Sequence, residues 1–252
     1  MPDPIMIAVL ALLGLVVGSF LNVVVHRLPR GESLSHPRSR CIGCGTQIAA
    51  YDNVPVISWA LLRGRCRHCG EPISVRYPLI EVLTAATFAA IAAIAGVDAE
   101  LWLALPFAAL MIAVAAIDIE HRIVPNKLLT PAAVWAVVAW PVVDLGFLPE
   151  ALVAAAGAFA FLLIAALAYP AGMGMGDVKL AGVMGLYLGL SVIPALAAAF
   201  LAGSIVGIAI VVRQGGDARK TGVPFAPFLA FGGLVGLLAG GELVALYADR
   251  FL

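Results

Sequence analysis

Charged side chains are scarce in this sequence. Asp, Glu, Lys and Arg make up 12% of its 252 residues, with 15 acidic residues balancing 15 Lys and Arg. Hydrophobic residues make up 63%, and the mean hydropathy is +1.06. A soluble domain of this size could not bury so much apolar surface, so the composition excludes a soluble globular protein and indicates a polytopic membrane protein. The zero net charge gives no indication of nucleic acid as a partner, and we expect none.

The N-terminal apolar segment lacks two marks of a secretory signal peptide, a basic region before it and a small-residue cleavage site after it. Its positive charges, Arg27 and Arg30, follow the apolar run instead. We therefore expect a retained first helix whose N-terminus is external. No internal repeat of the inverted-transporter kind is visible.

Apolar stretches long enough to cross a bilayer recur along the chain. A span needs roughly 20 apolar residues to cross about 30 Å of hydrocarbon, and shorter ones are tolerated where protein covers the backbone. The sequence predicts an all-α fold with about eight transmembrane helices, near residues 5–25, 79–96, 101–117, 128–147, 151–169, 178–192, 194–212 and 226–247. With the N-terminus outside, eight spans put every Lys and Arg except Arg250 on one side. The positive-inside rule makes that side cytoplasmic.

All four cysteines lie in the one long polar stretch, about residues 27–77, between the first two spans. They form two Cys-x2-Cys pairs, Cys41 with Cys44 and Cys66 with Cys69. Each pair places two thiolates on one turn, and two pairs complete a tetrahedral site for zinc. Two disulfides are the alternative, which a reducing cytoplasm disfavours. We expect a structural zinc, because a four-cysteine site leaves no open position and supplies folding energy to a domain of about fifty residues.

Two carboxylates lie where apolar spans meet polar segments. Asp118 closes the run 101–117, and Asp177 lies in GMGMGDVK, residues 172–179, before the sixth span. A carboxylate at the mouth of a membrane-embedded segment is costly, so it is a functional-site hypothesis by default. Both fall at the cytoplasmic ends of spans, where they can meet if spans three and six pack together. We interpret them as a catalytic pair that shares a proton, one carboxylate activating water while the other polarises a peptide carbonyl.

Helix capping is the alternative for either aspartate alone, and Asp177 could cap the sixth span. Capping leaves unexplained why two carboxylates occur at one depth. Glu81, near the start of the second span, could contact substrate or an arginine, or could be an interfacial carboxylate. Glu120 and His121 are expected in a solvated loop, and Asp52 is expected to form a turn.

An ordered set of motifs runs through nearly the whole chain. It comprises GSFLNVVVHRLP (18–29), YDNVPVISW (51–59), LRGRCRHCG (62–70), ISVRYPLIEVL (73–83), AAIDIEHRIVPN (115–126), GMGDVKLAGVMGLYLG (174–189) and VPFAPFLAFGG (223–233). This set closely resembles the prepilin leader peptidases of type IV pili and type II secretion, membrane aspartyl proteases that share a GxGD motif with presenilin-like enzymes. One departure is Ala226, where a glycine is common in the family, and we expect it to touch neither aspartate.

The resemblance implies a bacterial inner-membrane enzyme that cuts the short basic leader from prepilins or pseudopilins at the cytoplasmic face, after a glycine. The family's catalytic aspartates map onto Asp118 and Asp177, and its zinc ligands map onto the four cysteines. Many members then methylate the new N-terminus with S-adenosylmethionine, and the cysteine module accompanies that bifunctional form. The sequence has no glycine-rich strand-to-helix fingerprint, so the residues that bind the methyl donor stay unassigned.

The expected domains are a first transmembrane helix (1–26), a cytoplasmic four-cysteine zinc-binding domain (27–78) and a GxGD aspartyl peptidase membrane domain (79–252). Besides prepilin substrates, the expected partner is the lipid bilayer. A peptidase without methyltransferase activity is one alternative. A proton-coupled transporter would need carboxylates deeper in the spans, whose middles are free of charge. A zinc-bearing scaffold without chemistry would leave the placement of the two aspartates unexplained.

Overall fold

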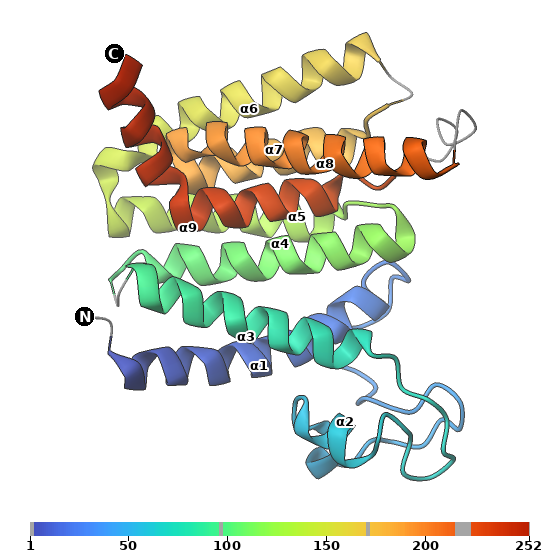
Figure 1. Cartoon of the computed structure of the whole chain (residues 1–252). Helices are drawn as coiled ribbons and strands as arrows, with labels where there is room; N and C mark the ends of the chain where they lie inside the picture. The colour runs from blue at the N-terminus through green and yellow to red at the C-terminus, as the bar shows by residue number, and fades with distance from the viewer. Residues whose placement is uncertain (1–2, 96–97, 170–171, 215–222, 252) are drawn as a thin grey trace. The chain divides into compact units, whose positions relative to one another are not determined.

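The computed structural model describes residues 3–95, 98–169, 172–214 and 223–251. Within these ranges the regular structure is helical apart from two isolated β-bridges. The elements are α1 (Pro4–Arg27), η1 (Ala50–Asn53), α2 (Ile57–Leu61), α3 (Arg76–Ala95), α4 (Leu101–His121), α5 (Asn126–Val143), η2 (Leu145–Phe147), α6 (Leu148–Ala168), α7 (Met175–Leu188), η3 (Gly189–Ser191), α8 (Val192–Gln214) and α9 (Ala226–Phe251) (Figure 1). They form two compact units, Met1–Val97 and Asp98–Leu252.

The first unit is built on a hairpin of α1 and α3. Asp3 caps α1 by accepting a hydrogen bond from the Ile5 N–H, and Pro4 occupies the first helical turn. Further along α1, Gly14 and Gly18 bring its backbone against α3. A Cβ atom on Gly18 would lie 2.7 Å from the Cα of Glu81. The two helices therefore touch along a small-residue seam, the packing that membrane helices favour.

The polar stretch between α1 and α3 folds into short turns and one short helix, α2. Arg27, at the end of α1, is buried and donates hydrogen bonds to the carbonyl oxygens of Ser33 and Pro37. The Trp59 indole N–H on α2 donates to the Ile73 carbonyl. Each of these side chains holds a loop in place through hydrogen bonds to backbone carbonyl groups. Such bonds stabilise a segment that is too short to form a large apolar core.

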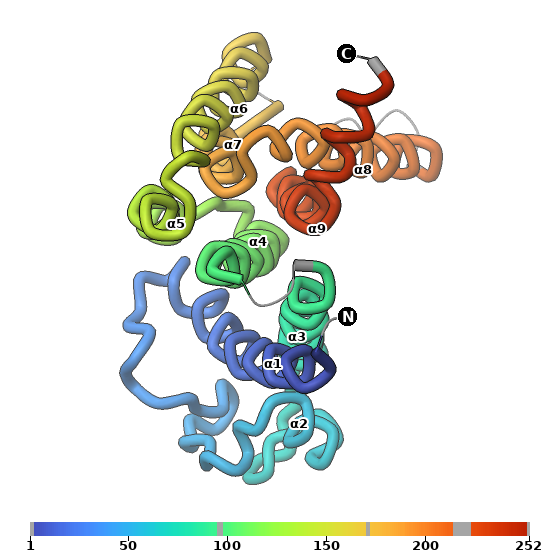
Figure 2. The backbone as a smooth tube through the Cα atoms, turned by 90° about the vertical axis from the view of Figure 1, so that its left-hand side faces the viewer, coloured from blue at the N-terminus to red at the C-terminus, as the bar shows by residue number. Residues whose placement is uncertain are grey.

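The second unit is a helical bundle in which α6 packs on α7 and α8 packs on α9, while α9 also contacts α4 (Figure 2). The largest fully buried side chains of α4 include Phe107, Met111 and Ile117. The Phe107 ring stacks on Tyr187 of α7 with centroids 4.9 Å apart. These contacts join the two helices that carry the aspartates.

Polar ties fix the short helix α7 among its neighbours. The Tyr187 hydroxyl donates to the Ala132 carbonyl of α5, and the Trp140 indole of α5 donates to the Leu186 carbonyl of α7. A Cβ atom on Gly185 would lie 2.5 Å from the Cα of Ala155 on α6, so the backbones of α6 and α7 touch at that point. Gly185 is thus a helix-packing glycine.

The eight predicted spans correspond to α1 and α3–α9, and the expected all-helical, multi-pass membrane fold is confirmed. By length and composition, seven stretches of the described residues could cross a membrane. The difference lies in α7, which has only 14 residues and joins α8 through η3 in a single apolar stretch, Met175–Arg213.

Candidate active site and metal centre

Asp118 lies in the last turn of α4, which continues to His121. The helix ends where Arg122 takes a left-handed conformation with φ 55° and donates its N–H to the Asp118 carbonyl. The prediction that Glu120 and His121 form a loop is therefore wrong, because no proline or glycine lies between Asp118 and Arg122 to end the helix earlier. The turn between α4 and α5 comprises only residues 122–125. Asp118 is 6% exposed, which makes it one of the few buried carboxylates of the described chain.

Asp177 lies in the first turn of α7, three residues after the N-cap Gly174. Its Oδ2 atom accepts a hydrogen bond from the Gly174 N–H at 3.3 Å. Asp177 thus takes part in capping its own helix without being the N-cap residue. It is nonetheless 8% exposed, more buried than capping alone requires, because caps are satisfied equally well at a solvated surface.

The two aspartates line one cavity of about 270 Å³, together with Arg122, Ile123, Val124, Gly174 and Gly176. Two short segments that are distant in sequence therefore form the walls, the turn after α4 and the glycine-rich start of α7. At Gly176 a Cβ atom would lie 2.8 Å from the Val124 Cβ, so glycine is what allows the two segments to touch. The structure brings Asp118 and Asp177 together as the sequence predicted.

A side-chain hydrogen bond links α7 to the start of α5. The Lys179 ammonium donates a hydrogen bond to the Asn126 side-chain oxygen at 3.1 Å. Asn126 starts α5, immediately after the turn that lines the cavity. Lys179 therefore links α7 to the residue that directly follows that turn.

Sequence reasoning missed one residue of the site, Ala226 at the start of α9. Its backbone N–H donates to Oδ2 of Asp118 at 3.2 Å, and Ala226 is completely buried. The expectation that this residue touches neither aspartate is wrong. A backbone amide carries no side-chain signal, so the contact could not have been read from residue type.

The four cysteines come together in the first unit through two equivalent turns. The Cys41 N–H donates to the Thr46 carbonyl and the Cys66 N–H to the Glu71 carbonyl, at 2.9 and 2.8 Å. The glycine after each pair has positive φ, 72° at Gly45 and 73° at Gly70, a conformation that glycine adopts at no steric cost. The four sulfur atoms all lie within 4.8 Å of one another.

Hydrogen bonding and burial shift the pKa values of Cys44 and Cys69 in opposite directions. Hydrogen bonds with Thr46 lower the pKa of Cys44 to about 6. A hydrogen bond with the Glu71 backbone lowers the pKa of Cys69, but burial and the neighbouring thiols outweigh it and raise this pKa to about 12. Four sulfurs at this spacing carry full charge together only around a bound cation. The donor set therefore fits a metal ion.

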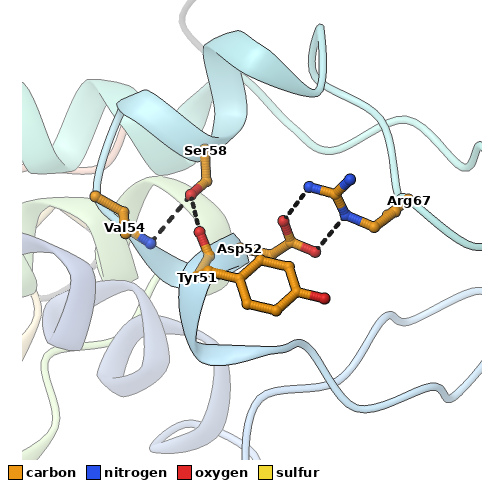
Figure 3. A network of polar contacts seen from close by, with 5 residues as sticks. All are labelled: Tyr51, Asp52, Val54, Ser58 and Arg67. Atoms are coloured by element: carbon orange, nitrogen blue, oxygen red, sulfur yellow. Dashed lines mark hydrogen bonds and ion pairs between the residues drawn. The ribbon is translucent and has the colours of Figure 1, made fainter.

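A polar network joins the second cysteine pair to η1 (Figure 3). The Arg67 guanidinium donates two hydrogen bonds to the Asp52 carboxylate, at 2.8 and 2.6 Å, and lies over the Tyr51 ring. The hydrogen bonds from Arg67 lower the pKa of Asp52. Ser58 of α2 accepts from the Val54 N–H and donates to the Tyr51 carbonyl. A turn was expected at Asp52, and the structure places it in the single-turn helix η1, where its carboxylate binds Arg67.

Glu81 of α3 connects the hairpin to the polar stretch. Glu81 is 6% exposed, and its carboxylate accepts a hydrogen bond from the Val56 N–H at 2.7 Å. Val56 precedes α2 and has a positive φ of 59°, which is costly for a β-branched residue. The Glu81 carboxylate offsets part of that cost by satisfying an amide at the start of α2. The sequence left a substrate, an arginine or an interfacial position open for Glu81, and the structure places its carboxylate against a backbone amide.

These features define a class of protein: a helical multi-pass membrane protein with a pair of buried carboxylates at one cavity and a four-cysteine metal-binding module. Family comparison points the same way. Residues 12–95 match the bacterial peptidase A24 N-terminal domain, and residues 105–212 match the type IV leader peptidase family.

Curated relatives cover most of the chain. A prepilin leader peptidase/N-methyltransferase of Bacillus subtilis is 35% identical over 98% of this chain and 100% of the relative. Proteins of the same name from Myxococcus xanthus and Aeromonas hydrophila are 37% and 33% identical, over 86% and 96% of this chain and 67% and 93% of the relatives. No solved structure matches. The chain belongs to the type IV leader peptidase family.

Proposed function

We propose that the protein is a membrane aspartyl endopeptidase that removes the short basic leader from type IV prepilins or pseudopilins and then methylates the new N-terminus. The observation that carries the peptidase activity is the shared cavity of Asp118 and Asp177. Family membership supports the choice of substrate, because the matched relatives are named for prepilin leader cleavage and N-methylation.

The pair can hydrolyse a peptide bond without a metal. Two carboxylates in one low-dielectric cavity share a proton. The ionised carboxylate takes a proton from water as the water oxygen attacks the amide carbon. The protonated carboxylate polarises the carbonyl oxygen and then donates its proton to the leaving amine. The products are a free leader carboxylate and a new N-terminal amine.

The cavity suits an extended peptide near the membrane surface. Gly174 and Gly176 form part of its wall, and residues without side chains let a substrate backbone come close to the Asp177 carboxylate. The positive-inside rule supports a cytoplasmic position for this end of α4 and α7, with the N-terminus external, in a bacterial inner membrane. On this proposal the chain has three functional parts: a first transmembrane helix (1–26), a zinc-binding domain (27–78) and a peptidase membrane domain (79–252).

Zinc is the metal that the cysteine module would hold, with Cys41, Cys44, Cys66 and Cys69 as its ligands. Two turns that each present two sulfurs satisfy tetrahedral coordination and leave no open position. The metal would therefore stabilise the module without taking part in peptide hydrolysis. Its binding free energy would serve as folding free energy for a segment with little apolar core.

S-adenosylmethionine would supply the methyl group for the new N-terminal amine. This part of the proposal rests on the names of the relatives and on the presence of the cysteine module, which accompanies bifunctional members. No residue of this chain is assigned to binding the methyl donor.

Mass spectrometry of a co-expressed prepilin tests both activities in one spectrum. We expect the wild-type protein to yield substrate that has lost its leader and gained one methyl group. Asp118→Ala and Asp177→Ala should each leave the leader attached, while the variants insert and fold normally. Leader loss without methylation would identify a peptidase alone. Intact substrate after incubation with the wild-type protein would overturn the proposal and favour a scaffold or a transporter.

A further inference from the structure

The start of α9 donates a hydrogen bond to a proposed catalytic carboxylate. The Ala226 N–H reaches Oδ2 of Asp118 at 3.2 Å, and both residues are buried. Ala226 does not line the cavity, so it approaches Asp118 from the side that is packed within the second unit. The contact is therefore part of the support of the site and not part of its substrate-facing wall.

The Ala226 N–H is not needed for a hydrogen bond within its own helix. The first hydrogen bonds of α9 are donated by the Phe228 and Leu229 N–H groups to the Phe225 carbonyl. The N–H groups of the first helical turn have no intrahelical acceptor, and Ala226 uses its own for Asp118. A buried N–H without this partner would cost free energy, so the helix start and the carboxylate satisfy each other.

Packing on both sides holds the start of α9 in place. The Phe225 ring lies 5.4 Å from Phe200 of α8, measured between centroids, and Phe200 in turn contacts Phe161 of α6 at 6.1 Å. Further along α9, a Cβ atom on Gly232 would collide with the Ala195 carbonyl oxygen, and one on Gly233 would lie 2.9 Å from the Met111 sulfur of α4. Close contacts to α8 and to α4 thus fix the helix that carries the Ala226 amide.

The two aspartates are held in parallel ways. Asp118 receives an amide from the start of α9, and Asp177 receives one from Gly174 at the start of α7. In each case Oδ2 is the acceptor. Within the described part of the chain, neither Oδ1 atom has a hydrogen-bond partner. One oxygen of each carboxylate is therefore fixed by backbone, and the other is available to water or to the peptide.

We propose that the N-terminus of α9 is a third element of the active site, in which the Ala226 amide positions Asp118 for water activation. The inference rests on the proposed peptidase function and adds to it a positioning residue outside the two aspartate motifs. An amide bound to an ionised carboxylate is a charge-assisted donor. Because it holds one oxygen, it restricts rotation of the carboxylate and keeps the second oxygen in a productive direction.

Replacement of Ala226 by proline removes this one donor. Proline is favoured at the first helical position, where its missing N–H breaks no helical hydrogen bond. We expect Ala226→Pro to lower kcat for leader cleavage by about 10- to 100-fold, the range for losing a hydrogen bond to a charged group. KM should stay unchanged because Ala226 does not touch the cavity. Ala226→Gly keeps the N–H and should retain kcat within a few-fold.

The proline ring adds atoms at a completely buried position, so a second variant isolates the amide. Incorporation of lactic acid at position 226 by nonsense suppression replaces the N–H with an ester oxygen and leaves the side chain unchanged. We expect the same loss of kcat from this ester, with a thermal unfolding midpoint in detergent close to that of the wild type.

The outcomes separate this inference from the function on which it rests. An ester variant with wild-type kcat would overturn the positioning role, and so would a loss of kcat in Ala226→Gly equal to that of the ester. A change in KM alone would also contradict it. Wild-type cleavage by Asp118→Ala would instead overturn the peptidase proposal itself.

Discussion

The cysteine module and the aspartate site bring their functional atoms together in opposite ways. In the module, each half of the site is a short turn closed by its own backbone hydrogen bonds and a positive-φ glycine. In the second unit, Asp118 and Asp177 come from different helices and meet only because α4, α7 and α9 pack as they do. The module depends on local geometry and a ligand, whereas the aspartate site depends on the helical bundle.

Metal removal should reveal the largest difference between the two regions, because it should unfold the cysteine module and leave the helices of the second unit intact. We expect one zinc per chain and its loss in Cys66→Ser. Structural zinc contributes on the order of 10 kcal/mol of binding free energy, so the module should then become protease-sensitive while the second unit keeps its helices. Metal analysis and limited proteolysis in detergent measure both effects. His68→Ala is the matched control, since His68 lies inside the second cysteine pair and is solvent-exposed. Four sulfurs paired in disulfides would contradict both the metal and the cytoplasmic orientation.

A substitution in the contact between α1 and α3 should have a smaller effect on stability than loss of the metal. A methyl group on Gly18 would lie 2.7 Å from the Cα of Glu81, whereas one on Gly157 would meet nothing within 4 Å. We expect Gly18→Ala to destabilise the α1–α3 hairpin by about 1–3 kcal/mol through overpacking. Gly157→Ala should be neutral or slightly stabilising, because alanine is the better helix former.

Thermal unfolding of both glycine variants in the same detergent measures this difference. Both substitutions add one methyl group to a helix, so the comparison isolates the close contact. Equal midpoints for the two variants would show that α1 and α3 do not touch at Gly18.

Sequence reasoning succeeded where local chemistry decides the structure. The spacing of the cysteines predicted the two turns, and the apolar runs predicted α1 and α3–α9 to within a few residues. The end of α4 was placed too early, because Glu120 and His121 are polar and yet complete the last turn before the left-handed Arg122. Polarity alone does not end a helix.

The rest of the site depends on tertiary structure. Nothing in the residue type of Ala226 indicates that its backbone N–H reaches Asp118, since that contact follows from the packing of α9 against α4 and α8. Likewise, the sequence around Glu81 does not indicate that its carboxylate accepts a hydrogen bond from the Val56 amide. Side-chain chemistry identified the two aspartates, and only the folded bundle identified what holds them.

The central claim is that Asp118 and Asp177 act as one catalytic unit, and leader-cleavage rates of Asp118→Ala, Asp177→Ala and the double variant test it most directly. Residues that act as a unit show strongly non-additive effects. We predict that each single variant loses at least about 1,000-fold in rate and that the double variant is no slower than either. Near-wild-type cleavage by a single variant, or losses that multiply in the double variant, would contradict a joint action of the two carboxylates.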